Sequence, residues 1–194
     1  MNIDVQNLIP VFVALPLAVC LLIQLLARGR PRLAGVLSIL AMLALVVMSI
    51  AAIGKGGLYH LGGWPTPIGI DLRLDDLSVL MLLVVNVIGL AVSLYAIDYM
   101  RRFTSEGYFY GLFLLMVTGM NGVVLAGDLF NLYVFLEVAA VASYALVAFG
   151  CAHEELEASF KYIVLGSLSS ALILIGIALV YGVTGTLNMA QMAG

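Results

Sequence analysis

Apolar residues along the chain gather into long runs, and short polar segments separate one run from the next. A helix needs about 20 apolar residues to cross the hydrocarbon core of a bilayer. Six runs come close to that length, so the pattern predicts an all-α membrane protein with six transmembrane helices. The predicted helices cover residues 5–27, 33–53, 77–99, 109–126, 129–149 and 158–182.

The connections between these runs predict how neighbouring helices are joined. Pro31, in the segment ARGRPRL, prevents one continuous helix through the first two runs. The turn AGDLF is so short that the fourth and fifth helices should be antiparallel neighbours. The long connection, residues 54–76, ends in the alternating stretch IGIDLRLDD, which predicts a short extended or hairpin segment at the membrane surface.

Composition supports the membrane class, because 64% of the residues are hydrophobic and only 10% are charged. Soluble proteins have about 25% charged residues. The eight Lys and Arg residues are scattered rather than gathered in a basic stripe, which argues against nucleic-acid binding. Cys20 and Cys151 form no metal-binding motif, and no nucleotide-binding glycine pattern occurs. The sequence therefore predicts no cofactor and no bound metal.

The basic residues of the loops predict the orientation in the membrane. Lys and Arg are enriched in cytoplasmic loops, and more of them follow the first and third helices than lie on the opposite side. We therefore expect a multi-pass protein of the cell (inner) membrane with its N-terminus outside. The first set is Arg28, Arg30, Arg32, Arg101 and Arg102, and the opposite set is Lys55 and Arg73.

Glu137 is the one carboxylate in the middle of a predicted span. It lies about eight residues into the fifth helix, roughly 12 Å deep at 1.5 Å per residue. An acidic residue at that depth costs about 2.5–3.5 kcal/mol on insertion scales. Two interpretations follow. The side chain is either a protonated group that hydrogen-bonds a neighbouring helix, or a site that takes up and releases protons or ions.

Further polar residues of the spans have both structural and functional interpretations. Lys161 opens the sixth helix, where a lysine can also extend its charged end to the interface. Ser167, Ser169 and Ser170 follow it, and with Asn121 they are candidates to line a polar, water-holding path.

Two other groups have simpler structural roles. Asp128 is expected to cap the fifth helix, and Asp98 to pair with the nearby arginines. Asn86 and Asn121 are expected to form hydrogen bonds between helices.

Two stretches carry a resemblance to a known family. They are YFYGLFLLMVTGMNGVVLAGDLFNLYVFLEVAAVASY and LEASFKYIVLGSLSSALILIGIALVYGVTGTLNMA. The chain resembles the D-type subunit of multisubunit Mrp cation/proton antiporters, which is related to antiporter-like subunits of respiratory complex I and of membrane-bound hydrogenases. The match covers nearly the whole chain, including the segment LGGWPTPIGIDLRLDDLS.

The resemblance implies roles for two residues. Glu137 matches the fifth-helix glutamate that the family uses in proton transfer, and Lys161 matches a sixth-helix lysine on the proton path of some members. Family members have about fourteen helices, built around inverted repeats. The sequence ends at TGTLNMAQMAG, where a broken seventh helix and its lysine should begin. We therefore expect the N-terminal six-helix portion of this fold, from a split subunit or a truncated product.

The expected function is ion translocation with proton transfer, in a multisubunit complex whose partners include a chain that supplies the missing helices. Residues 1–108 should hold the first three helices and the external loop 54–76, and residues 109–194 the first part of the proton-translocating repeat. One alternative is a proton-pumping subunit of a redox-driven complex, of the NADH-quinone oxidoreductase or hydrogenase type, without catalytic activity of its own. The other is a non-conducting scaffold half of a split subunit.

Overall fold

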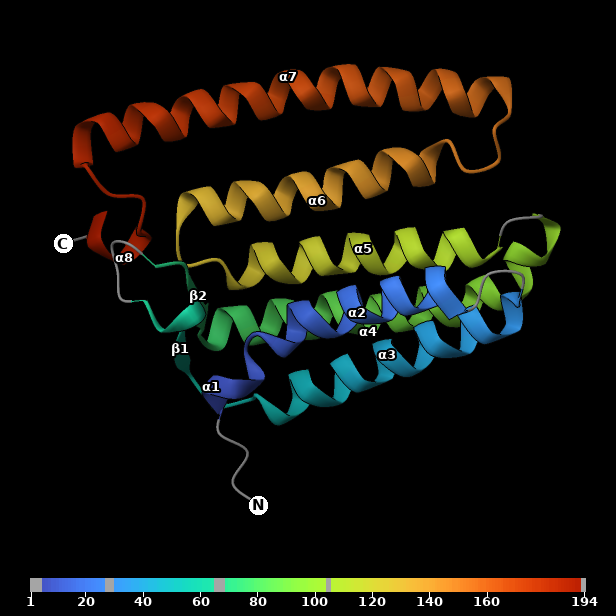
Figure 1. The fold of residues 1–194 in the computed structure, drawn as a ribbon, viewed down its shortest axis with the longest axis horizontal. Coiled ribbons are helices and arrows are strands. Elements are labelled where there is room, and N and C mark those ends of the chain that lie inside the picture. Colours follow the sequence, from blue (N-terminus) through green and yellow to red (C-terminus); the bar gives the residue numbers. More distant parts are fainter. Residues whose placement is uncertain (1–4, 27–29, 65–68, 104–105, 193–194) are drawn as a thin grey trace.

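Six helices run from one end of the molecule to the other (Figure 1), which confirms the predicted all-α fold with six transmembrane helices. The computed structural model describes residues 5–26, 30–64, 69–103 and 106–192. Five of the six helices have the length and hydropathy of a membrane span, and α2 is a shorter apolar helix. The six are α2 (Val11–Leu26), α3 (Pro31–Ala51), α4 (Asp76–Tyr99), α5 (Glu106–Leu125), α6 (Leu129–Val147) and α7 (His153–Thr184).

The first predicted span, residues 5–27, is wrong as a single helix. A short helix α1 (Val5–Leu8) is separated from α2 by a turn at Ile9 and Pro10. Proline lacks the N–H that would continue the helix from α1, but it fits the start of the next one. The carbonyl of Pro10 accordingly accepts the N–H of Ala14, 2.9 Å away, in the first turn of α2.

The last span is longer than predicted, because α7 begins at His153 rather than near residue 158. The carboxylate of Glu155 accepts the N–H of Ala152 at 3.3 Å, and acidic residues in a first turn favour a helix N-terminus. Gly185 ends α7 in the left-handed conformation, with φ 69°, which suits glycine at this position. Helix α7 therefore begins with a polar turn that precedes its apolar residues.

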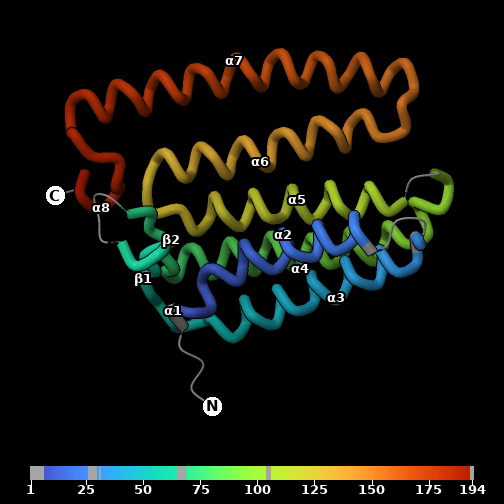
Figure 2. Tube along the Cα trace, in the orientation of Figure 1, coloured from blue at the N-terminus to red at the C-terminus, as the bar shows by residue number. Residues whose placement is uncertain are grey.

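The helices form a four-helix bundle with a thinner layer beside it. Helix α5 packs against α2, α3, α4 and α6, whereas α7 packs on α6. Figure 2 shows α5, α6 and α7 following one another as neighbours, with α7 farthest from the bundle. The short turn at Ala126–Asp128 makes α5 and α6 antiparallel, as predicted.

The connection between α3 and α4 contains the predicted hairpin. Strands β1 (Gly57–His60) and β2 (Asp71–Leu74) pair antiparallel, with Gly57 opposite Leu74. The 3-10 helix η1 (Leu61–Gly63) follows β1. A second 3-10 helix, η2 (Met100–Arg102), follows α4 at the other end of the bundle.

Asp71 joins the hairpin to segments distant in sequence. Its backbone carbonyl accepts the N–H of Gly127 at 2.9 Å. Its buried carboxylate accepts from Asn188 at 3.0 Å and lies 2.6 Å from Nδ1 of His60. The hairpin, the α5–α6 turn and the segment before the short helix α8 (Met189–Met192) therefore meet at one end of the bundle (Figure 1).

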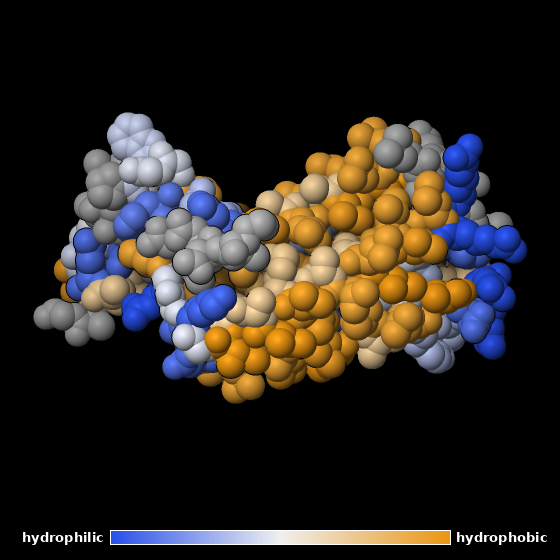
Figure 3. Space-filling model, turned by 90° about the horizontal axis from the view of Figure 1, so that it is seen from below, coloured by the Kyte–Doolittle hydropathy of each residue, from blue (hydrophilic) through white to orange (hydrophobic). Residues whose placement is uncertain are grey.

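Apart from Glu137 in α6, the charged residues lie toward the two ends of the bundle. Arg101 pairs with Asp98 at 3.3 Å, as predicted. Arg28 lies outside the described residues. Between the ends, Figure 3 shows a face covered by apolar side chains. Such a belt is what the lipid-facing surface of membrane helices requires, because hydrocarbon offers no partner to polar groups.

Candidate functional site

Glu137 lies in the middle of α6, and the start of that helix is fixed by Asp128. The Asp128 carboxylate accepts the N–H of Asn131 at 2.7 Å, which confirms its predicted capping role. Burial, opposed by this hydrogen bond and aided by the charge of Asp71, raises the pKa of Asp128. Glu137 follows nine residues later, about 13 Å along the helix, and is partly buried.

The carboxylate of Glu137 meets a hydroxyl from the neighbouring helix. Ser170 of α7, itself buried, donates a hydrogen bond to Oε1 of Glu137. The oxygen of Ser170 also lies 3.3 Å from the Tyr133 hydroxyl. A serine has a single hydroxyl proton, so when Ser170 donates to Glu137, Tyr133 donates to Ser170. The three side chains form a small polar cluster within the apolar contact of α6 and α7.

One side of Glu137 faces an apolar groove. The groove has a volume of about 400 Å³, and apart from Tyr133 and Glu137 its lining is aliphatic. Among the described residues, no basic side chain forms an ion pair with Glu137. The lining residues are Leu115, Tyr133, Val134, Glu137, Val138 and Val141.

Lys161 is not brought to Glu137. Its ammonium lies 2.5 Å from the carboxylate of Glu157, one turn earlier in α7, and its side chain is 67% exposed. It precedes Ser170 by nine residues, about 13 Å along the helix axis. Its position along α7 therefore leaves Lys161 outside the Glu137 cluster, with Glu157 as its partner.

Of the three candidate serines, only Ser170 reaches Glu137. Ser167 is exposed, and exposed Ser169 donates to the carbonyl of Leu165 in its own helix at 2.9 Å. Successive helical residues differ by about 100° around the axis, so the three cannot all face α6.

Asn121 lies in the bundle rather than in the α6–α7 contact. Its amide donates to Asn86 at 3.2 Å and to the carbonyl of Phe12 at 3.1 Å. That carbonyl would normally accept the N–H of residue 16, but Pro16 has none. Asn86 in turn donates to Ser49 at 3.1 Å. The predicted hydrogen bonds between helices are confirmed, and they join α2, α3, α4 and α5.

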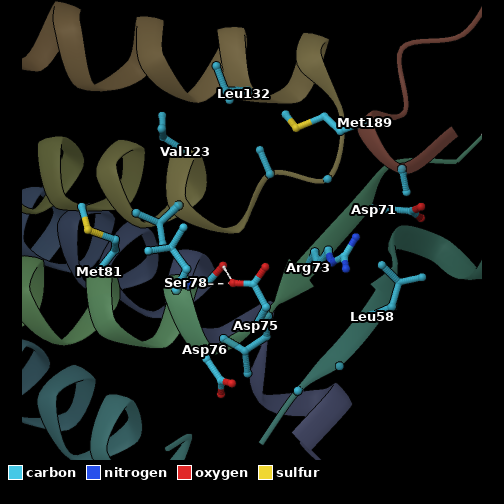
Figure 4. Close-up of a pocket in the computed structure, with 18 of the residues that line it drawn as sticks. Leu58, Asp71, Arg73, Asp75, Asp76, Ser78, Met81, Val123, Leu132 and Met189 are labelled. Atoms are coloured by element: carbon cyan, nitrogen blue, oxygen red, sulfur yellow. Dashed lines mark hydrogen bonds between the residues drawn. The ribbon is translucent and has the colours of Figure 1, made fainter. Parts of the chain in front are cut away.

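A cavity of about 1160 Å³ lies at the hairpin end (Figure 4). Asp71, Arg73, Asp75 and Asp76 contribute charge to its lining. Asp75 caps α4 by accepting the N–H and the hydroxyl of Ser78, each at 2.8 Å. These hydrogen bonds lower the pKa of Asp75.

Tyr133 and Asp71 are site residues that were not predicted from the sequence. Tyr133 precedes Glu137 by four residues, a spacing that places two side chains on one helix face, so a signal was present. Asp71 has no such signal in the sequence, because its partner Asn188 is 117 residues away.

Two family models match the chain. One, described as "NADH:quinone oxidoreductase/Mrp antiporter, TM", matches residues 126–194. The other, described as "NADH-Ubiquinone oxidoreductase (complex I), chain 5 N-terminus", matches residues 64–110. Glu137 and Ser170 lie within the first match.

Curated relatives include both antiporter and respiratory subunits. The chain is 43% identical over 192 residues to a probable D-type subunit of a K(+)/H(+) antiporter of Rhizobium meliloti, covering 93% of this chain and 35% of that protein. It is 40% identical to the N-type subunit of NADH-quinone oxidoreductase of Desulforudis audaxviator, covering 96% and 37%. The chain thus spans little more than a third of the length of these relatives.

Solved structures show the same fold in multisubunit membrane complexes. A chain of the archaeal membrane-bound sulfane sulfur reductase superposes with a TM-score of 0.90 at 35% identity, covering 97% of this chain and 39% of that one. A chain of the Mrp complex from Dietzia sp. DQ12-45-1b superposes with a TM-score of 0.88 at 31% identity, covering 97% and 36%.

Proposed function

Because this chain belongs to the family of membrane subunits shared by Mrp antiporters and NADH:quinone oxidoreductases, we propose that it carries protons in a multisubunit cation/proton antiporter. The observation that carries the proposal is Glu137, an ionisable group in the middle of α6 that meets a hydroxyl from α7. Intramembrane carboxylates are expensive to insert and mark proton or ion pathways.

The surroundings of Glu137 suit a group that exchanges protons. On one side, Ser170 and Tyr133 form a hydrogen-bonded cluster with it. On the other side, the groove leaves it accessible. We propose that a further helix packs over this groove and brings a basic side chain or water to the carboxylate. In the complex, another membrane chain would supply that helix.

A second candidate function is proton pumping in a redox-driven complex. It is favoured by the similarity to a subunit of NADH-quinone oxidoreductase and to a chain of the sulfane sulfur reductase. Glu137 would have the same role, with electron transfer confined to other subunits. Purification of the native complex separates the two candidates, since co-purifying iron–sulfur subunits favour the redox-driven one.

We propose that the protein lies in the cell membrane with its N-terminus outside. Arg30, Arg32 and the two arginines of η2 lie at the end of the bundle opposite the hairpin (Figure 1), and cytoplasmic loops are rich in such residues. Cysteine labelling of Arg30→Cys and Gly56→Cys, with Cys151 replaced by serine, tests this orientation. Reaction of both sites from the same side would contradict it.

We also propose a functional division of the chain. Residues 109–194 hold most of α5 with α6 and α7, and they would form the first part of the proton-translocating repeat. Residues 1–108, with the first three membrane helices and the external loop 54–76, would support it.

The test of the proposed function is Glu137→Gln in the assembled complex. Glutamine keeps the size and hydrogen-bonding capacity of glutamate but does not take up and release a proton. We expect collapse of a pH gradient in membrane vesicles, after addition of NaCl or KCl, to be abolished while the complex remains assembled. Glu154→Gln, at the exposed start of α7, is the matched control. Normal transport by Glu137→Gln would contradict the proposed proton transfer by Glu137. Loss of assembly in this variant would favour a structural role.

A further inference from the structure

We propose that the hydroxyls of Tyr144 and Tyr162 extend the proton path from Glu137 along the contact of α6 and α7, toward the end of the bundle that carries Arg101. This inference rests on the proposed function, because it needs Glu137 to exchange protons. It assigns a proton-transfer role to two side chains outside the Glu137 cluster.

The phenol of Tyr144 is fixed against the backbone of α7. A Cβ atom at Gly166 would overlap the Tyr144 hydroxyl, so the absence of a side chain at Gly166 creates the space that the hydroxyl occupies. The Tyr144 ring packs edge-to-face on Tyr162, with 4.7 Å between ring centroids. The Tyr144 backbone carbonyl also accepts the hydroxyl of Ser159 at 2.9 Å. Tyr144 is therefore held at both its backbone and its ring.

This position brings the Tyr144 hydroxyl near Glu137. Tyr144 follows Glu137 by seven residues, two turns of α6 on the same face. Helical side chains lean toward the N-terminus, so the phenol reaches back toward the carboxylate. Its neighbour Gly166 precedes Ser170 by four residues, an axial distance of about 6 Å. Ordered water can bridge the remaining gap between the phenol and the Glu137–Ser170 pair.

Tyr162 continues the line on the far side of Tyr144. Its hydroxyl lies 3.4 Å from the hydroxyl of Ser143, and its side chain is 45% exposed. The α6–α7 connection at this end lies beside the region after α4, where the rings of Phe103 and Phe149 are 5.9 Å apart. The line of hydroxyls thus extends from the middle of α6 toward the end of the bundle with the arginines, and Tyr162 lies about 13 Å from the start of α7.

The proposed step leaves each tyrosine unchanged. A hydroxyl accepts a proton on its lone pair from one neighbour and releases its own proton to the other, so one O–H bond forms as another breaks. Rotation about the C–O bond then restores the starting orientation. Among the described residues the Tyr144 hydroxyl has no hydrogen-bond partner, which leaves both its donor and acceptor positions for water.

The test is Tyr144→Phe in the assembled complex, measured in vesicles as the rate of pH-gradient collapse on addition of NaCl or KCl. Phenylalanine keeps the ring that packs on Tyr162 and removes only the hydroxyl. We expect transport to slow about tenfold or more, with a larger slowing in D₂O than the native complex shows and with unchanged assembly. Tyr95→Phe, an exposed tyrosine of α4, is the control and should transport normally.

Gly166→Ala tests the positioning independently. Its methyl group should displace the phenol and slow transport, but it should have little further effect in the Tyr144→Phe background. Transport by Tyr144→Phe within twofold of native, or loss of assembly in that variant, would overturn the inference. If Glu137→Gln is inactive at the same time, the proposed function stands without Tyr144. If Glu137→Gln transports normally, the proposed function itself fails.

Discussion

The bundle of α2 to α5 and the layer of α6 and α7 both place polar groups among apolar helices, but their chemistry differs. The buried polar residues of α3, α4 and α5 are serines, a threonine and two asparagines, all without ionisable groups in the working range. The layer holds Glu137 with hydroxyls around it. Neutral amides fix helices in place, whereas an ionisable carboxylate with one accessible side can exchange protons.

The two regions also differ in how many residues their helices bury. Helix α5 buries ten residues, while α6 buries Asn131 and Ala142, and α7 buries Ser159, Ser170 and Ile177. A buried polar group needs a hydrogen-bond partner from the chain or from ordered water. The bundle does this for Phe12 through Asn121. The layer leaves Glu137 open on its groove side, where another group can reach it.

The largest effect on assembly is expected at the contact between α5 and α6, where the two regions meet. A Cβ atom at Gly119 of α5 would lie 2.5 Å from the backbone nitrogen of Ala139 and 2.7 Å from the carbonyl of Phe135. Gly119→Val should therefore force α5 and α6 apart and prevent assembly, as measured by complex abundance in membranes. Gly176→Val on α7, where a Cβ atom meets nothing within 4 Å, is the matched control. Normal abundance of Gly119→Val would contradict the close contact of α5 and α6 at this glycine.

The next effect tests the structural role of Asn121. Asn121→Ala leaves the buried carbonyl of Phe12 without a donor, which costs about 1–3 kcal/mol. We expect a lower unfolding temperature of the purified complex, with transport per assembled complex unchanged. In a Pro16→Ala background, the restored N–H of residue 16 can satisfy Phe12, so the same substitution should cost less. Equal losses in both backgrounds would contradict this role of Asn121.

Two helix caps should respond to pH in opposite senses. The pKa of Asp75 is lowered from about 3.8 by its hydrogen bonds to Ser78. Its contribution to stability is therefore present above pH 3.8 and is lost as the pH falls through the lowered value. Asp75→Ala should cost about 0.5–2 kcal/mol at neutral pH. This difference should shrink in acid, as followed by thermal unfolding across a pH series.

Asp128 is the opposite case, because burial raises its pKa. Its ionised form is disfavoured in the folded state, and acid relieves that penalty as the pH falls through the raised value. Asp128→Asn keeps an equally good cap and removes the charge beside Asp71, so it should be neutral or slightly stabilising at neutral pH. A clear destabilisation in the same unfolding series would contradict this assignment.

The smallest effect is expected at Lys161. Its exposed pair with Glu157 is worth about 0.3–0.5 kcal/mol at most, so Lys161→Ala should leave assembly unchanged. We expect transport to fall only partly, in contrast to its abolition by Glu137→Gln, in the same vesicle assay. Complete loss of transport in Lys161→Ala would contradict this expectation and indicate that Lys161 lies on the central proton path.

Much of the fold, and the central residue of the site, could be predicted from local patterns in the sequence. Apolar run lengths predicted the spans, because each must cross the same bilayer thickness. The alternation in IGIDLRLDD predicted the hairpin, and the position of Asp128 before an apolar run predicted a cap. The depth of Glu137 singled it out because a carboxylate in hydrocarbon is rare.

The parts that could not be predicted depend on how the helices are rotated and joined. Sequence spacing shows that Ser169 points away from the face shared by Ser167 and Ser170, but only the position of α6 decides which serine meets Glu137. The pairing of Asn121 with Phe12 spans 109 residues. Similarly, the fit of Tyr144 against Gly166 depends on the closeness of two backbones.

The most direct test is whether Glu137 itself takes up and releases a proton in the working complex. Infrared difference spectra of the complex in lipid, recorded between two pH values at which transport is active, report protonation of a buried carboxyl through its C=O stretch. We predict a band that changes with pH in the native complex, shifts in Ser170→Ala, and is missing in Glu137→Gln. Identical difference spectra for the native complex and Glu137→Gln would contradict the central claim.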